Sequence, residues 1–196
     1  VLLGERALHA GVPHVAMANA DAARAVGEHL VASGRRRIAV VGSFDEPGPS
    51  AGSLRTGGLL DALAAAGVAH DPALVGHALE WTRAAGAAAM AEVLDRGVEI
   101  DAVFGLNDVL ALGAMRVLYE RGLRVPQDVA VAGFDDIEEA RFSRPSLTTV
   151  DPGRAEIATS AVALLVARLA PDAPAPASAE SVVSGFRLHV RESTAR

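Results

Sequence analysis

Short apolar runs and longer amphipathic segments alternate along the chain. Residues 38–41, 102–106 and 129–132 are runs of four or five mostly apolar residues, and each is followed by a glycine or a polar residue. Such runs predict strands that are buried on both faces of a sheet. The segments between them begin at cap residues and end at glycines, which predicts helices. Because strand and helix alternate, we predict an α/β fold with doubly wound parallel sheets.

The predicted elements cover most of the chain. Residues 44–52 contain two prolines and two glycines and are predicted to form a loop, with Ser53 as the N-cap of the helix that follows. Residues 171–177 are rich in alternating proline and alanine, which is typical of a linker. The predicted helices are 2–10, 19–33, 53–66, 82–96, 107–121 and 153–169, and the predicted strands are 14–17, 38–41, 74–78, 102–106, 129–132, 147–150 and 182–190.

Composition excludes several classes of protein. Of the 196 residues, 51% are hydrophobic and 21% are charged, a balance typical of globular rather than disordered chains. The absence of cysteine excludes disulfides and thiol catalysis. The net charge of −6 argues against this segment itself binding a nucleic-acid backbone. No segment reaches the roughly 18 apolar residues of a membrane span, so no membrane association is expected. Since the first residue is not Met, we expect the chain to be a fragment.

Motifs for metal binding and catalysis are weak or missing. The six histidines show no spacing typical of a metal site, so neither a metal nor a cofactor is predicted. No P-loop is present, because the chain has no lysine, and no dinucleotide fingerprint follows the strand 38–41. Residues 48–52 match Gly-x-Ser-x-Gly, which makes a hydrolase using Ser50 an alternative. That motif requires the serine on a tight turn directly between strand and helix, and residues 43–47 intervene here.

Polar and aromatic residues follow the predicted strands at the positions where ligands bind in parallel sheets. In such sheets the binding crevice lies beyond the carboxyl ends of the strands. Arg55, Trp81, Asn107 and Asp135 occupy such positions. Arginine donates, asparagine both donates and accepts, carboxylate accepts, and an indole offers an apolar face. This combination suits a neutral polyhydroxylated ligand.

Each of these residues also has a structural interpretation. Arg55 fits the surface of a helix, Trp81 fits the core and Asn107 fits an N-cap. Asp135 and Asp136 together fit a turn followed by a helix cap. Their common position at one edge of a predicted sheet favours a binding site.

The ordered set of motifs resembles the effector-binding core of the lactose/galactose-repressor family of bacterial transcription regulators. That family shares the fold of periplasmic sugar-binding proteins. The matching segments extend over essentially the whole chain in the family's order. They are His29-Leu30, the Gly-Arg-Arg-Arg-Ile-Ala sequence at 34–39, Arg-Thr-Gly-Gly at 55–58, Asn-Asp-Val-Leu-Ala-Leu-Gly-Ala at 107–114, Gly-Leu-Arg-Val-Pro-Gln-Asp-Val at 122–129, Gly-Phe-Asp-Asp at 133–136, Pro-Ser-Leu-Thr-Thr-Val at 145–150 and Val-Arg-Glu-Ser-Thr at 190–194.

The resemblance implies two lobes, joined by three crossovers near Gly34, Val150 and Ala177, with effector bound between them. One lobe would comprise residues 35–150 plus 178–196. The other would comprise residues 1–34 plus 151–177 and would be incomplete in this chain. The DNA-binding headpiece of the family would be absent as well, so operator DNA would be bound through a part that this chain does not contain.

The resemblance also assigns roles to individual residues. Arg55, Asn107 and Asp135 match positions that hydrogen-bond effector, and Trp81 matches an aromatic position that packs against it. Asp136 is expected to be a cap or a structural partner. Ala18 replaces an aspartate of the family ahead of Asn19, which is a departure on that side of the cleft.

The expected function is that of an allosteric sensor rather than an enzyme. A sugar or sugar derivative would bind between the lobes and control operator binding in a cytoplasmic homodimer. The alternative is a periplasmic-type sugar-binding protein for transport, and a serine hydrolase is the third class.

Overall fold

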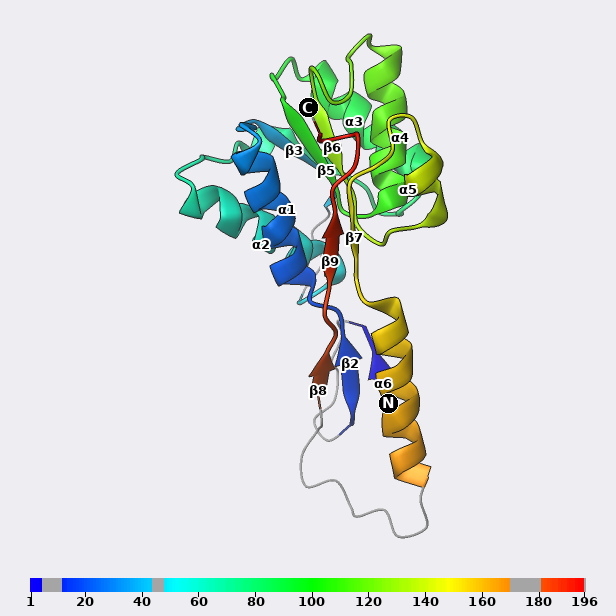
Figure 1. Ribbon diagram of the computed structural model, residues 1–196. Coiled ribbons are helices and arrows are strands. Elements are labelled where there is room, and N and C mark those ends of the chain that lie inside the picture. The colour runs from blue at the N-terminus through cyan, green and yellow to red at the C-terminus, as the bar shows by residue number, and fades with distance from the viewer. Residues whose placement is uncertain (5–11, 44–47, 170–180, 196) are drawn as a thin grey trace.

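The computed structural model describes residues 1–4, 12–43, 48–169 and 181–195 (Figure 1). Strands and helices alternate in it as predicted, and the α/β fold class with parallel sheets is confirmed. The strands are β1 (Leu2–Leu3), β2 (His14–Ala16), β3 (Ile38–Ser43), β4 (Val75–His77), β5 (Ala102–Gly105), β6 (Ala130–Ala132), β7 (Thr149–Asp151), β8 (Ser181–Val183) and β9 (Arg187–His189). The helices are α1 (Asn19–Ala32), α2 (Ala51–Ala65), α3 (Arg83–Asp95), α4 (Asp108–Glu120), α5 (Glu138–Phe142) and α6 (Arg154–Leu169), with a 3₁₀ turn at Pro72–Leu74.

A parallel sheet of four strands forms the centre of the larger part of the molecule. Its order is β4-β3-β5-β6, and β3 and β5 are buried along almost their entire length. Figure 1 shows α1 and α2 on one side of this sheet and α3 and α4 on the other. We call this sheet with α1 to α5 the large body. Apolar strands buried on both faces are what a doubly wound fold requires, which is why the strand prediction succeeded.

A second parallel sheet, of order β1-β2-β8, lies beneath the large body in Figure 1. Helix α6 lies beside it and contacts β2, and we call this group the small body. None of the α6 residues is buried, and Val162, Val166 and Leu169 are all more than half exposed. Strands β7 and β9 pair antiparallel and connect the two bodies. None of the helices within the described ranges has the length and apolarity to span a lipid bilayer.

Helix α1 packs against α2 and belongs to the core of the large body. Its buried residues Ala22, Val26 and Leu30 share one apolar cluster with the four-stranded sheet. The two helices approach so closely that a Cβ on Gly58 would overlap the carbonyl oxygen of Ala20. The predicted division of the chain placed α1 with residues 1–34 in the other lobe. In the structure α1 packs on the large body instead, because its apolar side chains are covered there by α2 and the four-stranded sheet.

The end of the chain also differs from the prediction. The single strand expected over residues 182–190 is two strands, β8 and β9, with Ser184 between them. Strand β8 pairs with β2, and β9 pairs with β7. The predicted division grouped both with residues 178–196. Strand pairing depends on partners distant in the sequence, so a continuous apolar pattern does not reveal where the chain changes sheets.

Two helix predictions are corrected at their starts. Helix α2 begins at Ala51 with Ser50 as its N-cap, whereas Ser53 was predicted. The Ser50 hydroxyl accepts from the Ser53 amide at 3.1 Å, and the Ser53 hydroxyl accepts from the Ser50 amide at 2.9 Å, which is a reciprocal capping box. Residues 2–3 form a strand where a helix over 2–10 was predicted. Residues 5–10 of that helix, the linker 171–177 and part of the loop 44–52 lie outside the described residues.

Candidate ligand-binding site at the ends of the parallel strands

Arg55 is the centre of the candidate site. It lies in the second turn of α2, and it is only 2% exposed. Its Nε donates to the Asn19 side-chain oxygen at 2.7 Å, and Nη1 donates to the Leu106 carbonyl at 2.6 Å. Its Nη2 lies 3.6 Å from a carboxylate oxygen of Asp135. One guanidinium therefore connects the start of α1, the end of β5 and the loop after β6.

Two aromatic rings enclose the same guanidinium. Its Cζ lies 3.6 Å from the centroid of the Phe134 ring and 5.4 Å from that of Trp81. Both distances are within the range of cation–π attraction, which is strongest for desolvated pairs. The indole of Trp81 is fixed in turn, because its Nε1 donates to the Gly42 carbonyl at 3.1 Å. Sequence reasoning identified Trp81 and missed Phe134, which precedes Asp135 directly.

Asp135 has a strained backbone and a partly exposed carboxylate. Its φ is +111°, which is rare for a residue with a side chain and occurs most often at functional sites. The side chain is 34% exposed, in contrast with the buried Arg55. Burial raises the pKa of Asp135, and the charges of Arg55 and Arg154 act in the opposite direction. The site therefore contains an accessible acceptor supported by a buried cation.

Asp136 has a structural role, as predicted. Its side chain is 1% exposed and forms ion pairs with Arg141, at 2.8 Å, and with Arg191. Burial raises the pKa of Asp136, but the hydrogen bonds and charges of these two arginines outweigh it and hold that pKa below its usual value. Asp136, Asp151 and His189 each have an atom that could bind a metal ion, and these three atoms lie within 4.8 Å of one another. Because two guanidinium groups already balance Asp136, this cluster is poorly suited to a cation.

Asn107 is the N-cap of α4, which was its structural interpretation. Its side-chain oxygen accepts from the Leu110 amide at 2.9 Å, and the residue is 9% exposed. It follows Leu106, whose carbonyl binds Arg55, so it lies at the same end of the sheet. The cap uses the amide oxygen only, and a cap does not preclude a contact through the amide nitrogen.

Asp108 is a buried carboxylate that holds the segment following Asp136, and sequence reasoning missed it. It is fully buried, and its carboxylate accepts from the Thr149 hydroxyl at 2.5 Å and from the Ile137 amide at 2.9 Å. Burial raises the pKa of Asp108 to about 7, although both hydrogen bonds lower it. A Cβ at Gly133 would overlap this carboxylate, which explains the glycine of the Gly-Phe-Asp-Asp sequence.

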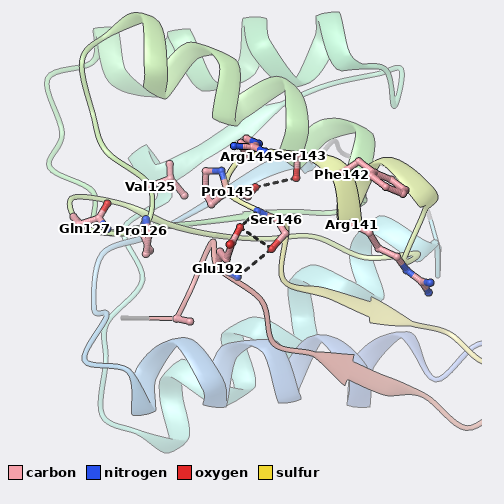
Figure 2. Close-up of a pocket in the computed structure, with 11 residues that line it drawn as sticks. Val125, Pro126, Gln127, Arg141, Phe142, Ser143, Arg144, Pro145, Ser146 and Glu192 are labelled. Atoms are coloured by element: carbon pink, nitrogen blue, oxygen red, sulfur yellow. Dashed lines mark hydrogen bonds between the residues drawn. The ribbon is translucent and has the colours of Figure 1, made fainter.

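Two cavities lie elsewhere on the large body. One of about 820 Å³ lies between the segments 125–127 and 141–146, and Figure 2 shows its lining. Within it, Ser146 donates through its amide and its hydroxyl to Glu192, at 2.8 and 3.0 Å. A neighbouring cavity of about 630 Å³ shares Arg144 and Pro145 with the first. Their linings do not include the four predicted ligand-binding residues, so these cavities and the candidate site are separate features.

The chain is similar to known proteins along most of its length. Residues 27–194 match the periplasmic binding protein-like domain family. The chain is 50% identical to the solved structure of a LacI-family transcriptional regulator from Sanguibacter keddieii, with a TM-score of 0.87. The match covers 93% of this chain and 67% of that one. The chain belongs to the LacI family. It covers the effector-binding core of that family, as the sequence motifs predicted.

Other LacI-family relatives extend the comparison. The HTH-type transcriptional regulator CelR of Thermobifida fusca is 37% identical over 185 residues, 93% of this chain and 52% of CelR. The CelR–cellobiose complex superposes with a TM-score of 0.88 at 35% identity, covering 97% of this chain and 58% of that chain. The transcriptional repressor CytR of Escherichia coli is 34% identical over 188 residues, 96% of this chain and 52% of CytR.

The chain spans about half the length of these two curated LacI-family relatives. The relatives are transcriptional regulators and not enzymes, so a hydrolase that uses Ser50 has no support among them. In the structure the Ser50 hydroxyl is engaged with Ser53 in the cap of α2.

Proposed function

We propose that this chain is the effector-sensing domain of a DNA-binding transcriptional regulator. It would bind a sugar or sugar derivative between the two bodies and thereby control the binding of operator DNA. The observation that carries the proposal is the pairing of buried Arg55 with the partly exposed Asp135, beside Trp81 and Phe134 at the ends of the parallel strands. Two solved relatives support the ligand class. One is the CelR–cellobiose complex, and the other is an Enterococcus faecium LacI-family regulator with bound ribose.

The chemistry of the four predicted residues fits a polyhydroxylated ligand. Asp135 supplies acceptors for hydroxyl groups, and Arg55 supplies donors and, through its charge, opposes the rise in the pKa of Asp135 that burial causes. Asn107 would contribute its amide nitrogen, because its oxygen caps α4. The indole face of Trp81 would pack against the apolar C–H face of a sugar ring. We predict all four as ligand contacts.

We infer that the large body and the small body are the two lobes of a sensor. The division would follow packing rather than the sequence ranges predicted first. The lobe of the four-stranded sheet would include α1, and the lobe of the β1-β2-β8 sheet would include α6. The three crossings would then lie after β2, after β7 and after β8. A ligand bound between them would favour the lobe arrangement for which its affinity is higher.

Operator DNA would be bound by a helix-turn-helix headpiece outside this chain, in the cytoplasm. A homodimer would match the symmetry of a palindromic operator. We place the dimer interface at the two neighbouring cavities of the large body. Tyr119 and Phe142, which line them, are large apolar side chains that are 77% and 74% exposed. Sedimentation equilibrium of the full-length protein tests this. Tyr119→Arg should yield monomers, whereas Leu79→Arg, at an apolar residue 82% exposed elsewhere, should leave the dimer intact.

The sensor function is tested with the full-length protein. Isothermal calorimetry with cellobiose, ribose and a panel of other sugars and nucleosides should identify a ligand. The same ligand should change the affinity for operator DNA, as measured by fluorescence anisotropy. Ligand binding with no headpiece encoded upstream would favour a transport protein instead, and no binding across the panel would contradict the proposed ligand class.

A further inference from the structure

Ser184 lies where the three chain crossings between the two bodies meet. It follows β8, and it is 2% exposed. Its amide donates to the Ala16 carbonyl at 3.0 Å, and its hydroxyl donates to the Pro152 carbonyl at 2.9 Å. Ala16 ends β2 before the first crossing, and Pro152 lies in the second. One buried residue of the third crossing therefore hydrogen-bonds both of the others.

The second and third crossings are also in direct contact. The carboxylate of Glu156, in the first turn of α6, accepts from the Gly185 amide at 2.9 Å. A Cβ at Gly153 would lie 2.5 Å from the Gly185 carbonyl oxygen, and Gly153 has a φ of +75°. Only glycine permits both the close approach and this backbone conformation. The root of α6 is thus fixed to the segment between β8 and β9.

Residues on either side of the second crossing bind the Asp135–Asp136 loop. Before the crossing, the Val150 carbonyl accepts from the Asp135 amide at 2.8 Å. After it, Nη2 of Arg154 donates to the Asp136 carbonyl at 3.0 Å. Arg154 is the first residue of α6 and belongs to the small body, whereas Asp136 belongs to the large body. This hydrogen bond therefore joins the candidate ligand loop of one body to a helix of the other.

We propose that Arg154 is a positioning residue that couples the Asp135–Asp136 loop to the angle between the bodies, with Ser184 fixing the crossings. The inference rests on the proposed function, because it takes Asp135 as a ligand contact. A rotation of α6 that moves Arg154 away from Asp136 would lengthen their hydrogen bond, and hydrogen bonds weaken as donor and acceptor separate. A ligand that prefers one position of the loop would therefore favour one angle between the bodies.

The loop stays anchored when Arg154 is changed, which makes the residue testable. The Asp136 carboxylate is held independently by Arg141 and Arg191, and Arg154 itself is exposed. Arg154→Met removes the charge and the donor but keeps an unbranched side chain. Arg168→Met, in the last turn of the same helix, is the matched control, because no polar contact of Arg168 is found among the described residues.

The measurement is the distance between spin labels on the two bodies, without ligand. Labels at Ala66→Cys, at the end of α2, and Ala167→Cys, in α6, use exposed positions. Double electron–electron resonance is recorded on the full-length protein, with any other cysteine replaced by serine. We expect Arg154→Met to shift or broaden the distance distribution and Arg168→Met to leave it unchanged. Arg154→Lys keeps a cationic donor and should restore the parent distribution.

Two results would overturn the proposal. One is the same distribution in Arg154→Met and Arg168→Met, and the other is no recovery in Arg154→Lys, which would assign the effect to packing of the arginine. Ser184→Ala gives an independent variant, and we expect a broader distribution for it than for Ser181→Ala, at an exposed serine of β8. Equal distributions in that pair would refute the role of Ser184. Since no ligand is present, a negative result here leaves the sugar-binding proposal intact, and failed sugar binding leaves this result intact.

Discussion

The guanidinium of Arg55 and the carboxylate of Asp135 lie 3.6 Å apart with very different access to solvent. The Arg55 side chain is 3% exposed and the Asp135 side chain is 34% exposed. The buried partner is held by the Asn19 side chain and the Leu106 carbonyl, and the exposed partner is held by its backbone. In this pair the cation also holds the fold together, and the anion is the group that is more accessible to a ligand.

Replacing the charged acceptor of Asp135 by a neutral amide should weaken ligand binding with little effect on the fold. We expect Asp135→Asn to lose about 1.5–3 kcal/mol of binding free energy, the scale of a hydrogen bond to a charged group. Asparagine is suitable because it tolerates the positive φ of this position better than alanine does. Calorimetry with the sugar identified by screening measures the change. Unchanged affinity in a folded Asp135→Asn protein would remove Asp135 from the site.

Removing the cation should instead destabilise the fold. Arg55→Met leaves the Asn19 oxygen and the Leu106 carbonyl without their buried donors. We expect a loss on the order of 3 kcal/mol in the free energy of unfolding, measured by urea denaturation. Arg55→Lys keeps the charge but cannot donate in all these directions, so its loss should be partial. Wild-type stability in Arg55→Met would contradict the central position given to this residue.

The contact between α1 and α2 predicts opposite effects at two neighbouring glycines. Gly58→Ala should destabilise the protein strongly, because its Cβ would overlap the backbone of Ala20. Gly57→Ala meets no atom within 4 Å and should stabilise the helix by about 0.5–1 kcal/mol through propensity alone. Thermal unfolding of the two variants provides the comparison. If both variants had similar melting temperatures, the close helix contact would be refuted.

Asp108 should make stability depend on pH between about 4 and 7. Its pKa is about 7 in the folded protein and 3.8 as the ordinary value, so the folded state binds more protons in this window. Stability from this group is fully present below pH 4 and is lost as pH rises towards 7. The shift of about three units corresponds to about 4 kcal/mol. The free energy of unfolding of the wild type and of Asp108→Asn is measured by denaturation at several pH values. The difference between the two should fall as pH rises from 4 to 7, and a difference that does not change with pH would argue against this prediction.

Local patterns determined the strands and helices of the large body. The apolar runs 38–41, 102–106 and 129–132 correspond to β3, β5 and β6, Thr82 caps α3 after β4, and Asn107 caps α4 after β5. Period, capping and glycine stops act within a few residues, so a sequence displays them directly. The family motifs are also short segments of sequence, so they can be recognised without the structure. The comparisons confirmed the family that they indicated.

Tertiary structure decided the features that depend on contacts between distant residues. Phe134 became part of the site only when the segment after β6 brought its ring beside Arg55, and Asp108 only when β7 brought Thr149 beside its carboxylate. The body to which α1 and β8 belong was decided by packing on α2 and by pairing with β2. A sequence specifies which surfaces are apolar and which backbone groups need partners. Which surfaces and groups then meet depends on the free energy of the whole packed chain.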